Sequence, residues 1–175
     1  IEMPAASFSQ IDALADALAT DRFEILLDPQ AIQGANSVLA LRCQQIVVPE
    51  EMIEPMLLQI HGMEFSYRGR RTYDKAIGAS FVEFTDAAAG QSLRTWMQNI
   101  VGGESHNGQS KRQYAVQGTL NIFDQSGEVA LAYRLDNCWP QQIPQIQLDG
   151  TNAAQFVMQT TFTFDRLSQN GVQIM

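Results

Sequence analysis

Two histidines and two cysteines are the residues of this chain best suited to bind a transition metal. His61, His106, Cys43 and Cys138 together match the donor set of a tetrahedral zinc site. Structural zinc sites hold their ligands in pairs at short spacings such as C-x-x-C or H-x-x-x-H, and these four residues form no such pair. The sequence therefore predicts no metal site and no cofactor. It predicts two buried free thiols, because two distant cysteines make no disulfide framework.

Two further groupings could support catalysis, and both lack a necessary part. Gly102 and Gly103, with the Ser-His pair behind them, resemble a phosphate-binding loop, but they follow a helical pattern, and phosphate binds where a helix begins. Glu50, Glu51 and Glu54 could act as acid and base, but they share one polar segment without an apolar pocket to raise a pKa. No nucleophile elbow, Walker loop, dinucleotide-binding turn or H-E-x-x-H helix occurs, so we expect no enzyme.

The composition is that of one acidic domain. The formal charge of -8 argues against broad nucleic-acid binding, which requires clustered Lys and Arg. A chain of 175 residues is long enough to bury a single core. No apolar run approaches the roughly 18 residues that cross a bilayer, and no basic-then-apolar leader is present. We therefore expect neither membrane insertion nor secretion.

One short segment reverses the local charge. Arg68, Arg70 and Arg71 lie close together and are predicted to form a basic turn. The acidic stretch 50–54 precedes this turn in the same region, so copies of the chain could dock head to tail through opposite charges. Ordinary solvated charge at a loop tip explains the same residues equally well, because exposed ion pairs contribute little.

Apolar and polar residues alternate over most of the chain, which predicts a mainly β fold. The expected strands are 22–27, 38–48, 56–68, 76–84, 114–122, 129–135 and 156–165. Pro49 should end the second strand, Gly62 should mark a bulge in the third, and a Cys-Trp-Pro corner should lie at 138–140. The last strand should turn Phe156, Met158, Thr160, Phe162 and Phe164 to the core.

Two helices complete the predicted elements. Apolar residues at helical spacing within 4–20 predict a short N-terminal helix. A stronger stripe comprises Leu93, Trp96, Met97, Ile100 and Val101. That helix should be capped by Thr85 or Asp86, should end at a pair of glycines, and should pack across the β core. The tail 168–175 is expected to be an extended arm.

The order of these elements resembles the tail tube proteins of contractile-tailed bacteriophages over about 22–167. The most specific features are the Arg71-Thr72-Tyr73-Asp74 turn and Trp139-Pro140 followed by Ile146-Gln147-Leu148-Asp149. The resemblance implies one domain, 1–175, folded as a β-sandwich or barrel-like subunit with one packed α-helix and a short N-terminal helix. Subunits of this family form stacked rings, which here are expected to contain six copies.

The resemblance also implies a location and partners. The chain is expected to assemble in the host cytoplasm into the tail of the virion, where the tube is the conduit for DNA ejection. Its expected partners are other copies of itself, the tail sheath, the baseplate and the tail terminator. The region around 48–71, which is expected to be hairpin-like, would by the same resemblance reach the adjacent ring. This places six residues at inter-subunit contacts: Glu50, Glu51, Glu54, Arg68, Arg70 and Arg71.

Elementary physics supports an assembling subunit. Strand edges that its own chain leaves uncovered find partners on neighbouring copies. An acidic, Gln-rich and Thr-rich inner wall would repel the phosphates of a passing genome, so DNA would pass without specific binding.

Two alternatives stay open. The tube of a bacterial contractile injection system is not distinguishable by sequence from a phage tail tube. A ligand-binding β-barrel would instead turn Tyr133, Phe156, Phe162 and Phe164 toward a cavity for a small apolar molecule.

Overall fold

The computed structural model describes residues 17–27, 35–102, 108–143, 146, 148–151 and 153–174. Within them, the strands are β1 (Phe23–Leu27), β2 (Cys43–Val47), β3 (Glu51–Ile60), β4 (Met63–Tyr73), β5 (Ala76–Val82), β6 (Val116–Phe123), β7 (Val129–Gln142), β8 (Val157–Thr163), β9 (Arg166–Gln169) and β10 (Val172–Gln173). The helices are α2 (Ala35–Arg42), α3 (Ala88–Val101) and α4 (Lys111–Tyr114). None of the described helices is long and apolar enough to cross a membrane.

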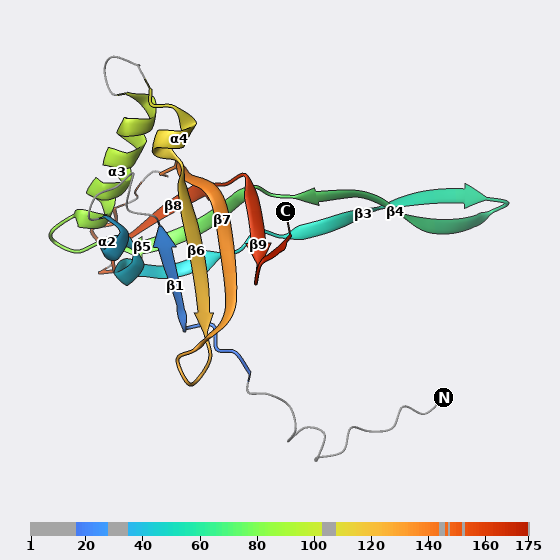
Figure 1. Ribbon diagram of the computed structural model, residues 1–175, viewed down its shortest axis with the longest axis horizontal. Coiled ribbons are helices and arrows are strands. Elements are labelled where there is room, and N and C mark those ends of the chain that lie inside the picture. The colour runs from blue at the N-terminus through green and yellow to red at the C-terminus, as the bar shows by residue number, and fades with distance from the viewer. Residues whose placement is uncertain are drawn as a thin grey trace.

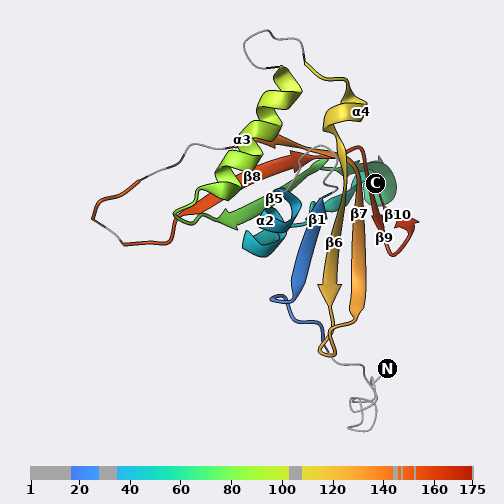
Figure 2. The same ribbon diagram turned by 60° about the vertical axis from the view of Figure 1, so that its left-hand side comes forward.

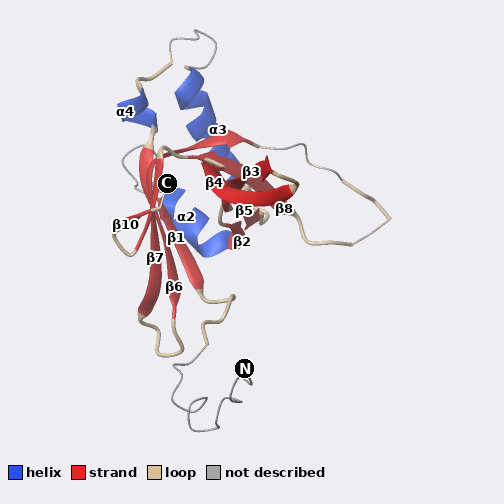
Figure 3. Cartoon of the chain, turned by 90° about the vertical axis from the view of Figure 1, so that its right-hand side faces the viewer, coloured by secondary structure: helices blue, strands red, loops and turns tan. Residues whose placement is uncertain are grey.

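Eight strands form one bent antiparallel sheet, with the order β1-β6-β7-β8-β5-β2 and with β9 and β10 beside β7. The bend lies in β7, where Asn137 has a φ of 56° and the strand passes from β6 and β9 to β8. We call β1, β6, β9, β10 and the first part of β7 the first half-sheet. The second half-sheet comprises the end of β7 with β8, β5 and β2. Figure 3 shows the two running in different directions.

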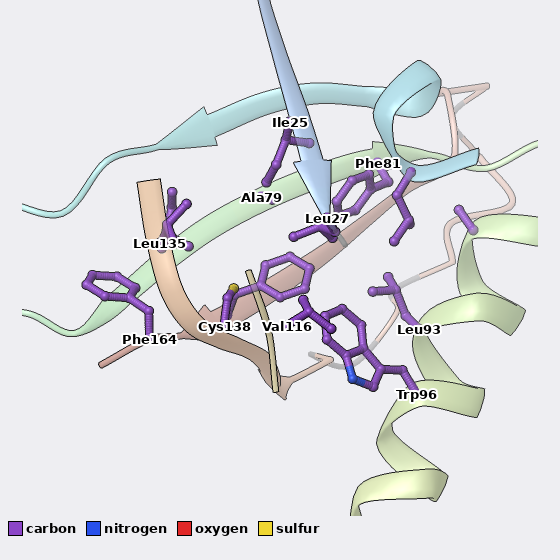
Figure 4. Packing of buried hydrophobic residues seen from close by; sticks show 14 of the residues in the cluster. Ile25, Leu27, Ala79, Phe81, Leu93, Trp96, Val116, Leu135, Cys138 and Phe164 are labelled. Carbon is purple, nitrogen blue, oxygen red and sulfur yellow. The ribbon is translucent and has the colours of Figure 1, made fainter. Parts of the chain in front are cut away.

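The core lies between the half-sheets and under α3 (Figure 4). Phe162 is completely buried at the centre, with its ring centroid 5.9 Å from that of Trp96 and 6.3 Å from that of Phe81. These three rings come from β8, α3 and β5, so they join helix α3 to the second half-sheet. The prediction of a mainly β, sandwich-like subunit with one packed helix is confirmed.

Helix α3 follows the predicted stripe and ends at Gly102, as expected. Its start differs from the prediction, because the N-cap residue is Ala87, whose side chain offers no acceptor. Carboxylates nearby take over this role. Glu83 accepts hydrogen bonds from the backbone N–H groups of Ala89 and Gly90, and Asp86 accepts one from Ala88. Acidic groups thus satisfy the free donors of the first turn. Figure 2 shows α3 beside β8 and β5.

The predicted strand 38–48 is wrong over its first half. Residues Ala35–Arg42 form helix α2, and only Cys43–Val47 form a strand. The segment is rich in good helix formers, and its apolar run fits either period over so short a length. Arg42, at the end of α2, binds Asp86 at 2.5 Å and Glu83 at 3.3 Å, which fixes the helix against the start of α3.

The predicted strand 56–68 is also wrong, because the chain reverses within it. His61 and Gly62 form a two-residue turn with φ values of 51° and 79° between β3 and β4. Positive φ at both positions is the geometry that connects twisted hairpin strands, and Gly62 serves this turn instead of a bulge. The basic run 68–71 lies inside β4 and is not a turn.

At the C-terminal end the prediction can be compared with the structure, whereas most of the predicted N-terminal helix cannot. The predicted arm 168–175 instead contributes to β9 and forms β10, which pair with each other and, through β9, with β7. Of the predicted N-terminal helix, residues 4–16 lie outside the described residues, and residues 17–20 are not helical. The hairpin predicted over 114–135 is confirmed by β6 and β7, except that Tyr114 ends helix α4 and the first strand begins at Val116. The core face predicted for 156–165 is confirmed by β8.

Candidate assembly interface

The hairpin of β3 and β4 projects from the body along the long axis of the molecule (Figure 1). Between Glu51 and Tyr73, every residue except Thr72 is exposed. Ten of the exposed large apolar side chains of the described chain lie here: Met52, Ile53, Met56, Leu57, Leu58, Ile60, Met63, Phe65, Tyr67 and Tyr73. A contiguous exposed apolar surface of this kind marks a site of protein–protein contact.

The strand register divides these side chains between two faces. Residues directly opposite in an antiparallel ladder point to the same side, and successive residues alternate. Leu58 pairs with Phe65, and Met56 pairs with Tyr67. Extending this alternation gives what we call the apolar face: Met52, Met56, Leu58, Ile60, Met63, Phe65 and Tyr67. Glu54 and Thr72 are its polar members, in the half nearer the body, so the outer half of this face is entirely apolar.

The opposite side, which we call the mixed face, combines charges with fewer apolar groups. Leu57 pairs with Ser66, Gln59 with Glu64, and Pro55 with Arg68. Water solvates such a face far better than the apolar face. The hairpin is therefore amphipathic, and within the described part of the chain both of its faces are exposed.

A bulge interrupts the ladder in the half of the hairpin nearer the body. The pairing shifts between Ile53 and Pro55, opposite the extra residues of β4. At this point β4 approaches β3 so closely that a Cβ on Gly69 would collide with the backbone carbonyl of Glu54. Only glycine permits this approach.

The six predicted contact residues all lie at or next to the base of this hairpin. Glu50 directly precedes β3, and Glu54 faces the bulge. Glu51 forms an ion pair with Arg71, whose guanidinium also donates a hydrogen bond to the backbone carbonyl of Ile174. Arg71 thus ties both hairpin strands to the C-terminal segment within one subunit. Arg68 and Arg70 are exposed on β4.

Ile174, to which Arg71 is bound, is itself held by contacts with the body of the subunit. The Ile174 backbone N–H donates to the carbonyl of Leu167 at 2.8 Å, and its side chain packs against the core cluster. The contact of Arg71 with Ile174 therefore joins the hairpin base to the hydrophobic core. The sequence predicted contact residues in this region from their charge and did not predict this internal link.

The sequence indicated that one side of this segment is apolar, but it did not indicate what that side packs against. The alternation of Met63, Phe65 and Tyr67 indicated a strand with one apolar side, which is correct. The same alternation describes a strand on its own core and a strand waiting for another subunit. The register opposite β3, which depends on the turn at 61–62, supplies the missing half of the face.

A second uncovered feature is the seam where the bent sheet fails to close. β1 and β2 end the strand order and are not paired with each other. A pocket lies along this seam, lined by Leu18, Ala19, Thr20, Phe23, Gln44, Gln45, Ile46, Val48, Leu120 and Ile122. Open ladder edges of this kind pair readily with another chain.

The residues suited to metal chemistry do not come together. No group of three or more His, Cys, Asp or Glu side chains gathers into a potential metal site in the described part of the chain. His61 occupies the hairpin turn, and His106 lies outside the described residues. Cys43 and Cys138 are free thiols, and burial raises the pKa of each to about 12. Neither thiol has the depressed pKa of a reactive cysteine.

The aromatic residues proposed to surround a ligand fill the core instead. Phe162 and Phe164 are buried, and Tyr133 and Phe156 pack against the same cluster. Their side chains occupy the interior of the bent sheet, which removes the observation that favoured a ligand-binding barrel.

Comparison with known proteins identifies relatives of this fold and sequence. The sequence matches the family described as phage tail tube protein over residues 6–170. A curated relative, the tail tube protein of Serratia phage KSP90, is 26% identical over 102 residues. This alignment covers 58% of the chain, and the chain spans only 57% of that relative.

Solved structures share the fold. A chain of the sheath–tube complex of the extracellular contractile injection system PVC, in its extended state, aligns with a TM-score of 0.62 at 16% identity. That alignment covers 96% of this chain and all of the other. The tube-terminating cap of the anti-feeding prophage aligns with a TM-score of 0.63 at 17% identity, over 90% and 93% of the two chains. With the family match extending over nearly the whole sequence, the chain belongs to the phage tail tube protein family.

Proposed function

We propose that this chain is the building block of a tail tube in the virion, in which six copies close into a ring and the rings stack into a conduit for DNA. The observation that carries the proposal is the projecting hairpin, whose apolar face is exposed and is covered by none of the residues that the structure describes. A two-stranded ribbon is marginally stable alone, and an exposed apolar face costs solubility. Both problems disappear when the hairpin packs on a second copy.

The hairpin and the seam suit contacts in two directions. The hairpin extends well beyond the body along its long axis, which suits contact with a subunit of the next ring (Figure 1). β1 and β2 end the strand order of the bent sheet, and such terminal strands suit pairing between neighbours within a ring. A heterologous contact of this kind produces closed rings when the rotation closes.

Charge has a smaller part in the proposal than the sequence suggested. Arg71 and Glu51 pair inside the hairpin, so their charges are compensated within one subunit. The exposed residues Glu50, Glu54, Arg68 and Arg70 are proposed to border the apolar contact, where they would select register and partner more than affinity.

We infer the wider assembly from the family match and from the solved structures that share this fold. Tail sheath, baseplate and tail terminator are the proposed partners, and we infer a purely structural role without catalysis or cofactor. The tube of a bacterial contractile injection system is the second candidate, favoured by the fold shared with the PVC chain. The match to phage sequences favours the tail tube.

Electron microscopy of the purified chain tests the proposal. We expect rings and tubes in negative-stain micrographs, together with size-exclusion elution that shifts to larger species with concentration. A compact particle near 19.4 kDa at every concentration would contradict the proposed function.

A further inference from the structure

The two half-sheets present very different outward faces. On β5 and β8, Ile77, Phe81 and Phe162 point to the core, so the intervening residues point outward. The ladder places Ser80 beside Gln45 on one side and Gln159 on the other. These pairings describe a polar surface made of hydroxyl and amide groups.

No outward position of the second half-sheet is charged, and all of its strand residues belong to the described chain. The polar groups on this face are Gln45, Ser80, Gln142, Gln159, Thr161 and Thr163. The remaining outward positions are small or apolar, and Val47 is the one strongly exposed large apolar side chain among these described strands. A surface with so little exposed apolar area gains little from docking on another protein.

The first half-sheet has a charged outward face. Leu135 and Leu167 are paired and buried, so their neighbours point outward. Arg134, Asp136 and Arg166 lie there, with Arg134 bound to Asp136 at 3.0 Å. Such a face is suited to bulk water and to charged partners. The subunit therefore has one charged side and one uncharged side.

The strands of the uncharged face run in the same direction as the projecting hairpin. β2 leads into β3 after residues 48–50, and β4 leads into β5 after residues 74–75. Figure 1 shows the hairpin continuing the run of these strands away from the body. If hairpins join successive rings, the strands of the second half-sheet run along the tube, and their outward face forms a continuous surface from ring to ring.

We infer that the outward face of the second half-sheet is the wall along which DNA moves, and that this wall is uncharged. The inference rests on the proposed function. It differs from the acidic wall expected from composition, because the net charge of -8 is carried by other surfaces. A hydroxyl and amide wall binds no phosphates through counterion release and repels none, so DNA slides past without electrostatic capture.

Single-cysteine labelling, in a background in which Cys43→Ala and Cys138→Ala remove the two native thiols, locates the wall. Thr161→Cys places a thiol on the uncharged face, and Asn121→Cys is the matched control on the outward face of the first half-sheet. In assembled tubes, we expect Thr161→Cys to react with a small maleimide but not with a maleimide on a long polyethylene glycol chain, whereas Asn121→Cys reacts with both. Reaction of Thr161→Cys with both reagents, or with neither, would overturn the placement.

Charge substitutions then test whether the wall is uncharged. Tubes of wild-type, Gln159→Lys and Gln159→Glu protein are mixed with short linear DNA and treated with nuclease. We expect only Gln159→Lys tubes to retain nuclease-resistant DNA, with retention that falls steeply as salt increases. Asn121→Lys, on the other face, should yield only nuclease-sensitive DNA. Salt-sensitive retention by wild-type tubes, or none by Gln159→Lys tubes, would overturn the inference.

The same samples separate this inference from the proposed function. Micrographs without tubes would contradict the proposed function and the inference together. Tubes that form normally but label or retain DNA in the wrong pattern would contradict the inference alone.

Discussion

Strands β5 and β8 and the hairpin of β3 and β4 follow the same sequence rule and have opposite fates. Both pairs are antiparallel and alternate between apolar and polar residues. In β5 the alternate residues Ile77, Ala79 and Phe81 are almost completely buried, whereas in β3 the alternate residue Leu58 remains 44% exposed. Alternation thus defines which face is apolar, and the rest of the chain decides whether that face is covered.

The two regions also differ in what stabilises them. The ladder of β5 and β8 gains from helix α3, from aromatic contacts and from the first half-sheet, all in one subunit. Among the described residues, the hairpin is stabilised by its own hydrogen bonds, by its cross-strand pairs and by the link through Arg71. We therefore expect substitutions in the body to act on folding and substitutions on the hairpin to act on assembly.

Truncation of the central indole should produce the largest loss of stability. Trp96 is 1% exposed, contacts Phe162, and donates a hydrogen bond from Nε1 to the carbonyl of Tyr114 at 2.8 Å. Trp96→Ala should lower the free energy of unfolding by about 3–5 kcal/mol in urea titrations. Trp96→Phe keeps much of the packing and should lose clearly less. Equal losses for both variants would contradict the packing account.

Addition of one methyl group at the start of α3 should have a smaller effect. A Cβ on Gly90 would lie 2.7 Å from Cε of Met158 and 2.8 Å from Oε2 of Glu83. Gly90→Ala should therefore lower the free energy of unfolding by about 1–3 kcal/mol, despite the better helix propensity of alanine. Met158→Ala removes the methyl group that a Cβ on Gly90 would meet. The double variant Gly90→Ala, Met158→Ala should therefore lose less stability than the sum of the two single losses in a double-mutant cycle.

The buried thiol of Cys138 should make stability depend on alkaline pH. Burial raises its pKa from 9.0 to about 12, so the unfolded chain loses this proton first. Its contribution is constant below about pH 9 and declines as the pH rises from 9 toward 12. Urea titrations across this range should show the decline, and a Cys138→Ala variant should show a shallower one. Identical pH profiles would show that the thiol is accessible in the native state.

Removal of the link between hairpin and body should have the smallest effect on folding. Arg71 pairs with Glu51 and with the carbonyl of Ile174 at an exposed site, so Arg71→Ala should lower stability by less than about 1 kcal/mol. Hydrogen exchange should nevertheless accelerate at both strands of the hairpin base. Arg68→Ala is the matched control, and equal exchange in the two variants would contradict a link specific to Arg71.

How far the sequence predicts this molecule depends on whether the deciding contacts are local. The stripe around Trp96, the hairpin of β6 and β7, and the core face of β8 were predictable because each pattern is long and has one period. Helix α2 was not, since eight residues of mixed apolar sequence fit two periods and the contacts of Arg42 with Glu83 and Asp86 settle the outcome. Those partners lie about forty residues away along the chain.

The candidate interface shows the same limit in a different form. The charges of the hairpin base and the alternation of Met63, Phe65 and Tyr67 were readable in the sequence, and both lie in the hairpin that the structure shows. The turn at His61 was not, because positive φ is uncommon for any residue other than glycine and a His-Gly pair is a weak turn signal. Without the turn, the sequence does not predict which residues of β3 lie opposite those of β4. Without that register, it does not predict that their apolar side chains share one face.

Two adjacent leucines provide the most direct test of the central claim, that the apolar face of the hairpin is buried against a second copy. Leu58 lies on the apolar face and Leu57 on the mixed face, and both are exposed in the single subunit. Leu58→Ser and Leu57→Ser should therefore unfold at the same urea concentration as the wild type. In sedimentation velocity at matched concentration, we expect Leu58→Ser to remain monomeric and Leu57→Ser to assemble. Assembly of both variants, or of Leu58→Ser alone, would contradict the account.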